Sequence, residues 1–221
     1  MGKKNKLQRY REVSDMEIVL EYTDFENRPD GKPKGEWHQK YFGNGRPIIL
    51  ELACGKGDYA LNLARREPEL NVVGVDIKGA RIWKGATTAR DEGVENVRFL
   101  RIFIDHLDEY FDRGEVSEIW ITFPDPYLKE KKESKRLTSP RFLDTYRKVL
   151  APGGEIHLKT DSLPLYEYTL ETIRDQNCEL LDQVDDVYRE RPEDPLLTIQ
   201  TYYEKMHLRD GKTIRYVRFR I

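Results

Sequence analysis

The fold of this chain is decided by the segment Ile48-Ile49-Leu50-Glu51-Leu52-Ala53-Cys54-Gly55-Lys56-Gly57. Its first six residues are mostly apolar and predict a buried strand, and the two glycines that follow predict a tight turn. Apolar residues at helical spacing begin at Tyr59, so a helix is predicted after the turn. Asp58 is a suitable residue to cap its amino end. A strand, a turn and a helix in this order form one unit of an α/β fold.

The same alternation continues along the chain. Further strands are predicted at 72–76, 97–102, 119–122 and 155–160, with helices near 79–92, 107–111, 140–150 and 164–176. Two more strands are predicted in the remainder, the last at 214–221. Such alternation predicts a mainly parallel sheet with helices on both faces, because crossover connections are right-handed. We therefore expect a Rossmann-like, doubly wound α/β fold with a seven-stranded sheet.

The polar segment before Pro47 sets the domain organisation. It contains the turn-forming run Pro29-Asp30-Gly31-Lys32-Pro33-Lys34-Gly35, which is typical of a linker. We expect residues 1–44 to form a partly ordered basic extension and residues 45–221 to form one α/β domain. A chain of 221 residues is long enough for one such domain, whereas two independent domains would be cramped.

Composition argues against several classes of protein. No run approaches the roughly 18 consecutive apolar residues of a membrane span, and the start Met1–Lys6 has no apolar signal-peptide core. The two cysteines, Cys54 and Cys178, fit neither a metal cluster nor a disulfide framework. We therefore expect a cytoplasmic protein with no membrane partner and no metal ion.

The charges are unevenly distributed, although the net charge is only −2. Basic residues gather in 1–11, 129–136 and 205–220, and acidic residues gather in 182–194. Because phosphate binding depends on the local field rather than on the total charge, one basic face for a nucleic acid is compatible with this sequence. Each basic run taken alone is more typical of a solvated surface. The run in 1–11 fits a flexible nucleic-acid-binding arm and a solubilising tail equally well.

A second informative segment is Ile119-Trp120-Ile121-Thr122-Phe123-Pro124-Asp125-Pro126. The β-branched and aromatic run predicts a buried strand, and two prolines then bracket Asp125. Because proline disfavours the helical region for the residue before it, we expect Phe123 and Asp125 to be extended. Ligands of open α/β sheets bind at the carboxyl ends of the strands. Asp125 is therefore a candidate ligand-contacting carboxylate.

Acidic residues also surround the first glycine turn. Asp76 ends the second predicted strand 19 residues after Gly57, where a carboxylate accepts hydrogen bonds from ribose hydroxyls. Together with Gly55, this fits a dinucleotide or another adenosine cofactor. A pyrophosphate is disfavoured because Glu51 lies before the turn and Asp58 after it. Two carboxylates favour a cationic ligand, such as the sulfonium and ammonium of S-adenosylmethionine.

Four short motifs are distinctive as a set. They are Leu50-Glu51-Leu52-Ala53-Cys54-Gly55-Lys56-Gly57, Phe123-Pro124-Asp125-Pro126, Lys135-Arg136-Leu137 and Gly154-Glu155-Ile156-His157-Leu158-Lys159-Thr160-Asp161. Together they closely resemble the bacterial tRNA (guanine-N7-)-methyltransferase family, with weaker similarity near Thr201–Glu204. The resemblance implies a class I methyltransferase domain over 45–221, S-adenosylmethionine as the methyl donor, and N7 of a guanine in the tRNA variable loop as the acceptor.

The resemblance also implies roles for individual residues. The residues expected to hold the cofactor are Glu51, Gly55, Gly57, Asp76, Asp105 and Asp125, the last being the family's active-site aspartate. The residues expected to contact tRNA are Lys129, Asp161, Thr201, Tyr202, Tyr203 and Glu204. The chain departs from the family's usual residues at Ala53, Tyr127 and Leu128. Alignment puts Phe103 where most members have an acid or amide, two positions before Asp105, so either residue is a candidate for contact with the adenine.

The chemistry of guanine N7 agrees with this set of residues. N7 carries a lone pair and no proton, so it attacks a methyl group directly, and the four histidines form no base-plus-orienter pattern. We expect Asp125 to accept hydrogen bonds from guanine N1–H and the exocyclic amine, and to offset the positive charge that develops on the purine. Two alternatives remain open: a methyltransferase of the same fold with another substrate, and a catalytically silent RNA-binding protein. A monomer and a homodimer are both compatible with the sequence.

Overall fold

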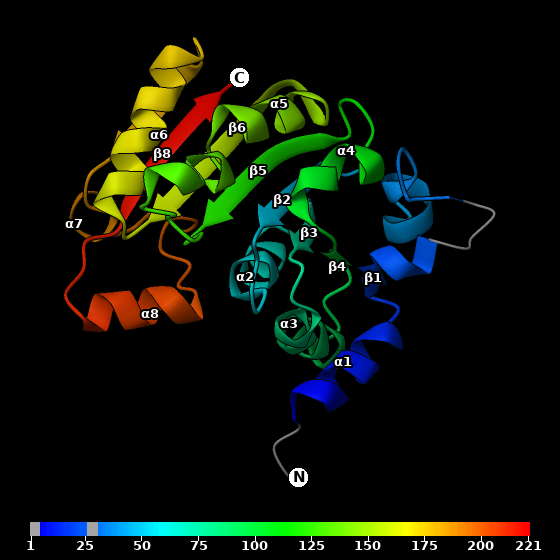
Figure 1. The fold of residues 1–221 in the computed structure, drawn as a ribbon. Coiled ribbons are helices and arrows are strands. Elements are labelled where there is room, and N and C mark those ends of the chain that lie inside the picture. Colours follow the sequence, from blue (N-terminus) through cyan, green and yellow to red (C-terminus); the bar gives the residue numbers. More distant parts are fainter. Residues whose placement is uncertain (1–4, 26–30) are drawn as a thin grey trace.

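The computed structural model describes residues 5–25 and 31–221 of the chain. Within these residues, eight strands form one sheet in the order β1-β4-β3-β2-β5-β6-β8-β7, with helices on both sides (Figure 1). The strands are β1 (Val19–Glu21), β2 (Ile48–Leu52), β3 (Asn71–Val75), β4 (Val97–Arg101), β5 (Val116–Thr122), β6 (Leu150–Thr160), β7 (Glu179–Val184) and β8 (Arg215–Arg220).

The helices alternate with the strands through most of the chain. The α-helices are α1 (Lys6–Ser14), α2 (Asp58–Arg66), α3 (Gly79–Glu92), α4 (Leu107–Tyr110), α5 (Pro140–Arg147), α6 (Leu163–Asp175), α7 (Val187–Glu190) and α8 (Tyr202–Arg209). Shorter or wider helical turns are η1 (Tyr22–Phe25), η2 (Trp37–Phe42), η3 (Ile104–His106) and η4 (Glu130–Lys135).

The pairing of the strands confirms a mainly parallel, doubly wound sheet. Strands β1 to β6 pair in parallel, and β8 lies antiparallel between β6 and β7. The prediction of seven strands was wrong, because β1 extends the sheet beside β4 within the described residues. A strand of three residues shows no detectable alternation in the sequence. That Val19–Glu21 form a strand becomes evident only from their pairing with β4.

The amino-terminal residues contribute to this sheet and to its cover. Helix α1 packs on α3, where the Trp83 indole N–H donates to Glu12 at 2.8 Å and the Arg9 guanidinium lies 5.1 Å from the Trp83 ring centroid. In β1, Glu21 forms a largely buried ion pair with Arg101 at 2.9 Å. The basic residues Lys3 and Lys4 lie outside the described residues.

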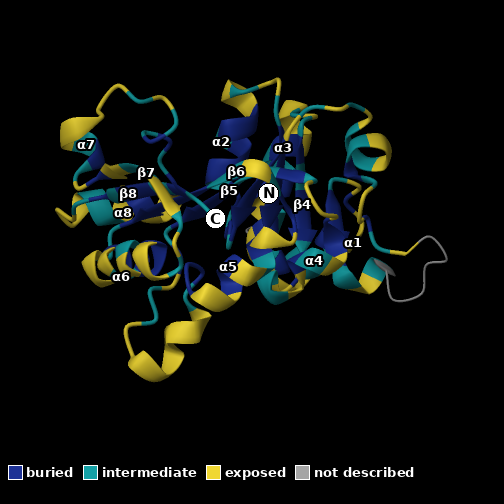
Figure 2. Cartoon of the chain, turned by 90° about the horizontal axis from the view of Figure 1, so that it is seen from above, coloured by how far each residue is buried: buried dark blue, intermediate teal, exposed yellow. Residues whose placement is uncertain are grey.

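Two layers of apolar side chains cover the sheet, one on each face. Helices α4, α5 and α6 enclose a cluster that includes Tyr146 and Phe219. Helices α1, α2 and α3 enclose a cluster that includes Tyr59 and Phe99 on the other face. Figure 2 shows the buried strands between the two layers of helices. No helix in residues 5–25 and 31–221 is long and apolar enough to cross a membrane.

The centre of the sheet contains the point where the strand order reverses. From β2 the chain continues to β3 on one side and later reaches β5 on the other side. Leu52 pairs with Val75 of β3 and with Ile121 of β5, so these three strands end at the same level. A reversal of strand order opens a crevice at the carboxyl ends of the strands, and ligands of this fold bind there.

The last part of the chain combines a confirmed prediction with a missed element. The two predicted strands are β7 and β8, but α7 and α8 were not expected. Helix α8 exposes Tyr202, Tyr203 and Met206 to solvent while it buries Glu204. This arrangement reverses the usual amphipathic pattern, so apolar periodicity gave no indication of the helix.

Candidate active site

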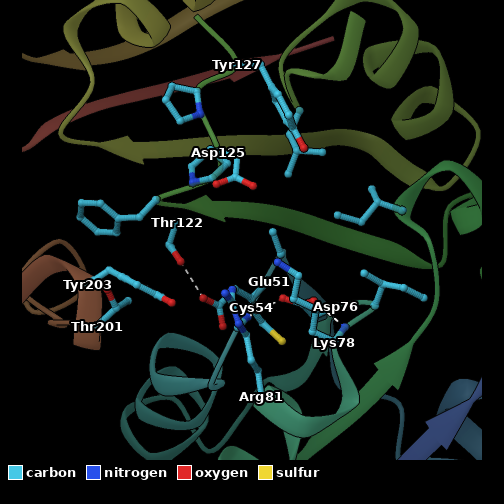
Figure 3. A pocket seen from close by; sticks show the side chains of 18 of the residues that line it. Glu51, Cys54, Asp76, Lys78, Arg81, Thr122, Asp125, Tyr127, Thr201 and Tyr203 are labelled. Atoms are coloured by element: carbon cyan, nitrogen blue, oxygen red, sulfur yellow. Dashed lines mark hydrogen bonds between the residues drawn. The ribbon is translucent and has the colours of Figure 1, made fainter. Parts of the chain in front are cut away.

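A cavity of about 950 Å³ opens at the carboxyl ends of the central strands. Figure 3 shows Asp125 and Tyr127 on one side of it and Glu51 and Asp76 on the other. The expected site residues that line it are Glu51, Gly55, Asp76, Asp105, Asp125, Asp161, Thr201 and Tyr203. The expected site residues that do not line it are Gly57, Lys129, Tyr202 and Glu204. The structure therefore brings together most of the residues that the sequence singled out.

The Glu51 carboxylate forms the floor of the cavity and anchors a helix. It is 1% exposed, and one of its oxygens accepts from the Ala60 backbone N–H at 2.8 Å. The other oxygen accepts from the Thr122 hydroxyl at 2.6 Å (Figure 3). Burial raises the pKa of Glu51 to about 8, and the two hydrogen bonds oppose this rise. Glu51 thus joins the end of β2 to the first turn of α2 and to the end of β5.

The Asp76 carboxylate organises the glycine turn from the neighbouring strand. Its two oxygens accept from the backbone N–H groups of Gly55 at 2.9 Å and of Lys78 at 2.8 Å. A carboxylate has about four acceptor positions, so these two bonds leave acceptor capacity on the side facing the cavity. These two hydrogen bonds fix the position of the Asp76 carboxylate, so that position does not depend on a bound ligand.

Glycine is favoured at the two positions of the turn, Gly55 and Gly57, for different physical reasons. Both have positive φ, +57° at Gly55 and +70° at Gly57, a region that favours glycine. A Cβ on Gly55 would meet nothing closer than the Ala53 carbonyl oxygen at 3.9 Å, so the space beside it is open to the cavity. A Cβ on Gly57 would lie 2.4 Å from the Phe99 ring. Gly57 is therefore required by packing.

Asp58 does not cap α2, contrary to the expectation from sequence. The residue at the cap position is Gly57, and no side chain caps the helix there. The Asp58 carboxylate instead accepts from the Tyr202 backbone N–H at 3.0 Å, at the start of α8. Local sequence favoured the nearest helix, whereas the fold brings a second helix start within reach.

The Pro-bracketed loop turns sharply at the end of β5. Phe123 has a φ of +50°, so the expectation of an extended Phe123 was wrong. Its backbone N–H donates to the Lys159 carbonyl at 2.8 Å, and this bond holds the turn against the local preference of a residue before proline. Tyr127, at the far end of the loop, also has a positive φ of +43°.

Asp125 is the exposed carboxylate of this loop, and it lines the cavity. Among the residues that the structure describes, no side chain or backbone group forms a hydrogen bond or an ion pair with its carboxylate. Pro124 beside it is buried. The loop therefore presents a carboxylate from a fixed backbone, with its acceptor positions available to a ligand.

Asp161 lies at the end of β6 in a cluster that sequence spacing did not indicate. Its oxygens lie 2.6 Å from Lys212 Nζ and 3.4 Å from His207 Nε2. Lys212 and His207 both line the cavity, although neither was singled out as a site residue. They come from α8 and the loop after it, some fifty residues from Asp161 along the chain, so only the fold reveals the cluster.

Phe103 and Asp105 both reach the cavity, on the loop after β4. Phe103 is 58% exposed, whereas the Asp105 carboxylate forms an ion pair with Arg141 at the start of α5. Arg141 and Arg81 also line the cavity and were missed. Each lies on an exposed helix face, where a single arginine is typical of any soluble protein.

Glu204 and Tyr202 point away from the cavity. The Glu204 side chain is fully buried beside Lys159, and Tyr202 faces solvent with Lys56 Nζ 3.1 Å from its ring centroid. Thr201 caps α8, with its hydroxyl accepting from the Glu204 backbone N–H at 3.1 Å. Lys129 directly precedes the exposed segment η4, outside the cavity.

In the described part of the chain, no group of three or more His, Cys, Asp or Glu side chains is arranged to hold a metal ion.

The chain is similar to known proteins over most or all of its length. Residues 45–216 match a family model described as "Putative methyltransferase". The chain is 45% identical over 223 residues to the tRNA (guanine-N(7)-)-methyltransferase of Christiangramia forsetii, with 100% of both chains covered. It is 50% identical over 187 residues to the protein of the same name from Porphyromonas gingivalis, covering 84% of this chain and 76% of the relative.

Solved structures show the same fold. The 16S rRNA methyltransferase KamB superposes with a TM-score of 0.62 at 16% identity, covering 83% of this chain and 91% of that chain. A variant of the 16S rRNA (adenine(1408)-N(1))-methyltransferase of Catenulisporales acidiphilia, solved with its cosubstrate SAM, gives a TM-score of 0.60 at 19% identity, covering 84% of this chain and 89% of that chain. At these identities the likeness concerns the fold alone, and it confirms the class I methyltransferase architecture.

Proposed function

The chain belongs to the tRNA (guanine-N(7)-)-methyltransferase family, and we propose that it transfers a methyl group from S-adenosylmethionine to N7 of a guanine in the variable loop of tRNA. The observation that carries this proposal is Asp125, an exposed carboxylate on a fixed loop across the cavity from Glu51 and Asp76. The protein acts in the cytoplasm, where tRNA is its macromolecular partner.

The residues of the cavity fit the methyl donor. The open space beside Gly55 accommodates the amino-acid part, and Asp76 accepts from the ribose hydroxyls through its remaining acceptor positions. The Asp58 carboxylate, which lines the cavity, favours a cationic ligand, and a cation bound nearby would also favour the ionised form of Glu51. Phe103 and Asp105, which follow β4 and line the cavity, are the two candidates for contact with the adenine.

S-adenosylmethionine supplies an electrophilic methyl group on a positively charged sulfur when it is bound. With the donor bound, the N7 lone pair of guanine would form the new bond to the methyl carbon as the carbon–sulfur bond breaks, and the electron pair of that bond would stay on sulfur. No proton leaves N7, so the protein needs no general base. Positioning is the main requirement of such a step.

Asp125 provides this positioning on the acceptor side. Its free carboxylate oxygens accept from guanine N1–H and the exocyclic amine, a pattern that adenine does not offer. The negative charge also offsets the positive charge that develops on the purine as the methyl group is transferred. Tyr127, on the same loop as Asp125, provides an aromatic surface at the cavity that is suited to an unstacked base.

The deciding experiment incubates the purified protein with isotopically labelled S-adenosylmethionine and unmodified tRNA and then maps the labelled base. We expect label at N7 of one variable-loop guanine. Label on another nucleotide, on another RNA or on a small molecule would assign a different substrate to the same fold. Binding of tRNA without any transfer, together with no affinity for the donor at millimolar concentration, would identify a silent RNA-binding protein.

A further inference from the structure

An ion pair between Lys159 and Glu204 lies entirely inside the protein. Lys159 Nζ is 2.6 Å from Glu204 Oε1, and both side chains are 0% exposed. Lys159 belongs to β6, and Glu204 lies in the first turn of α8. Removing two charges from water is costly, and well-packed apolar residues often stabilise a fold equally well. A buried pair of this kind therefore suggests that the two charges fix one particular packing of α8 against β6.

The contacts of Glu204 leave it no access to a ligand. Its carboxylate also accepts from the Tyr188 hydroxyl at 2.9 Å and from the Thr201 backbone N–H at 3.3 Å. Glu204 does not line the cavity, whereas Thr201 and Tyr203 beside it do. Its carboxylate is thus directed to the inside of the protein, away from the surface where tRNA would lie.

Lys159 connects two walls of the cavity. Its side chain reaches Glu204 and the Ile199 carbonyl, the latter at 3.0 Å, and its own carbonyl accepts from Phe123 at the start of the Asp125 loop at 2.8 Å. The Phe123 ring in turn stacks on the His207 ring of α8, with centroids 5.7 Å apart. Lys159 therefore bonds both to the loop that carries Asp125 and to helix α8.

Helix α8 needs such an anchor because it stands apart from the main layers of helices. Figure 1 shows it beyond the end of the sheet, joined to its neighbours by loops on both sides. A second connection, from the Tyr202 backbone N–H to Asp58, holds its first turn beside α2. Three of the largest side chains of α8 face solvent instead of the core: Tyr202, Tyr203 and Met206 are 48%, 37% and 42% exposed. Within α8, Leu208 is the apolar side chain that packs against the core, so only a small apolar contact holds the helix.

We infer that the Lys159–Glu204 pair positions α8 as a wall of the acceptor site, and that Glu204 acts through Lys159 rather than by touching tRNA. The pair places Thr201, Tyr203 and His207 along the cavity, beside the loop that carries Asp125. The tRNA part of this inference rests on the proposed function. Among the described residues, Lys159 and Glu204 bond to no residue of the donor half of the cavity, built on β2 and β3, which α8 contacts through Tyr202 at Asp58 and Lys56.

The test compares Glu204→Gln with the double variant Lys159→Met/Glu204→Gln. The single variant leaves the Lys159 charge buried without a counter-charge, while its amide keeps the hydrogen-bonding shape of the carboxylate. We expect kcat/KM for tRNA to fall about 10- to 100-fold, because small misplacements of binding groups have effects of this size. The dissociation constant of S-adenosylmethionine should change far less than kcat/KM for tRNA, because Lys159 and Glu204 do not contact the donor half of the cavity. The double variant removes both charges, so most of the tRNA activity should return.

The return of activity is the decisive observation. If the Glu204 carboxylate contacted tRNA directly, adding Lys159→Met could not restore activity, and a double variant as impaired as the single one would overturn the inference. The surface variant Glu92→Gln is the matched control, since Glu92 pairs with Arg65 on the exposed side of α2 and α3. It should behave as the wild type in every assay.

A second readout does not depend on activity. Hydrogen exchange of the α8 amides should accelerate in Glu204→Gln and return to the wild-type rate in the double variant. Unchanged exchange in α8 of the single variant would contradict the positioning role, even if activity falls. If the wild-type protein transfers no methyl group to tRNA, the proposed function fails, while the exchange experiment still tests the anchoring of α8.

Discussion

Single residues at this site divide into those that face the ligand and those that hold the residues facing it. Asp125 is exposed at the cavity without a partner among the described residues. Glu51 and Asp76 use both oxygens to accept from backbone or hydroxyl donors of the protein. The sequence assigned all three to ligand binding. The contacts instead show that Glu51 and Asp76 first build the turn against which a ligand would lie.

Replacement of Asp125 tests the acceptor role. Asp125→Ala should lower the rate of methyl transfer to tRNA by about 100-fold or more, because the guanine loses its positioning group. The affinity for S-adenosylmethionine, measured by titration, should change little. Asp144→Ala, the same substitution at an exposed carboxylate of α5, is the control. Normal turnover by Asp125→Ala would refute the assigned role.

The raised pKa of Glu51 predicts a pH-dependent stability. The folded protein retains this proton up to a pKa of about 8, whereas the unfolded chain releases it near the usual pKa of about 4.3. Between these values the unfolded state binds fewer protons, so the free energy of unfolding falls as the pH rises, by up to about 1.4 kcal/mol per pH unit. The stabilisation is complete below the lower pKa and is lost as the pH approaches the upper one.

Urea unfolding of Glu51→Gln between about pH 5 and pH 8 checks this prediction. The glutamine does not ionise, so the variant should lack the downward slope that the wild type shows. Glu92→Gln, an exposed carboxylate replaced in the same way, should retain the wild-type slope. The explanation is wrong if Glu51→Gln and the wild type lose stability in parallel.

At the scale of elements, the β2–α2 turn shows how packing and ligand binding share one short loop. A Cβ at residue 57 would meet the Phe99 ring at 2.4 Å, while one at residue 55 would point into open space. Gly57→Ala should therefore lower the free energy of unfolding by about 1–3 kcal/mol more than Gly55→Ala does. Gly55→Ala should mainly reduce affinity for S-adenosylmethionine. Chemical unfolding and donor titration of both variants separate the two effects; equal stability losses would refute the packing argument.

The exposed lysines in and next to η4 predict a phosphate-binding surface beside the loop that carries Asp125. Lys129 and Lys132 are exposed there, next to Lys135 at the cavity. Lys129→Ala combined with Lys132→Ala should weaken tRNA binding and reduce the salt dependence of log K by about 0.7–0.9 for each phosphate that the protein no longer neutralises. Arg90→Ala, at the far end of α3, is the control. An unaltered salt dependence would place the phosphate-binding side chains elsewhere.

At the scale of the whole molecule, the amino-terminal residues form one edge of the sheet and cover β4. Strand β1 pairs with β4, and α1 covers α3. Deletion of residues 1–21 should lower the free energy of unfolding and expose the β4 edge, which favours self-association through strand pairing. Urea unfolding and size-exclusion chromatography measure these two effects. A truncated protein as stable and as monodisperse as the full chain would indicate a dispensable extension.

The sequence by itself determined the alternation of strands and helices, and hence the parallel sheet and the edge where its site lies. Apolar runs such as Ile48–Leu52 and the glycines after them are local signals, so they can be read along the chain. The tertiary structure decided what each polar side chain contacts. Asp58 binds the start of α8, Glu204 pairs with Lys159, and Asp161 meets Lys212. Each of these partners is distant in sequence or hidden by burial, and only the packing of the chain brings them together.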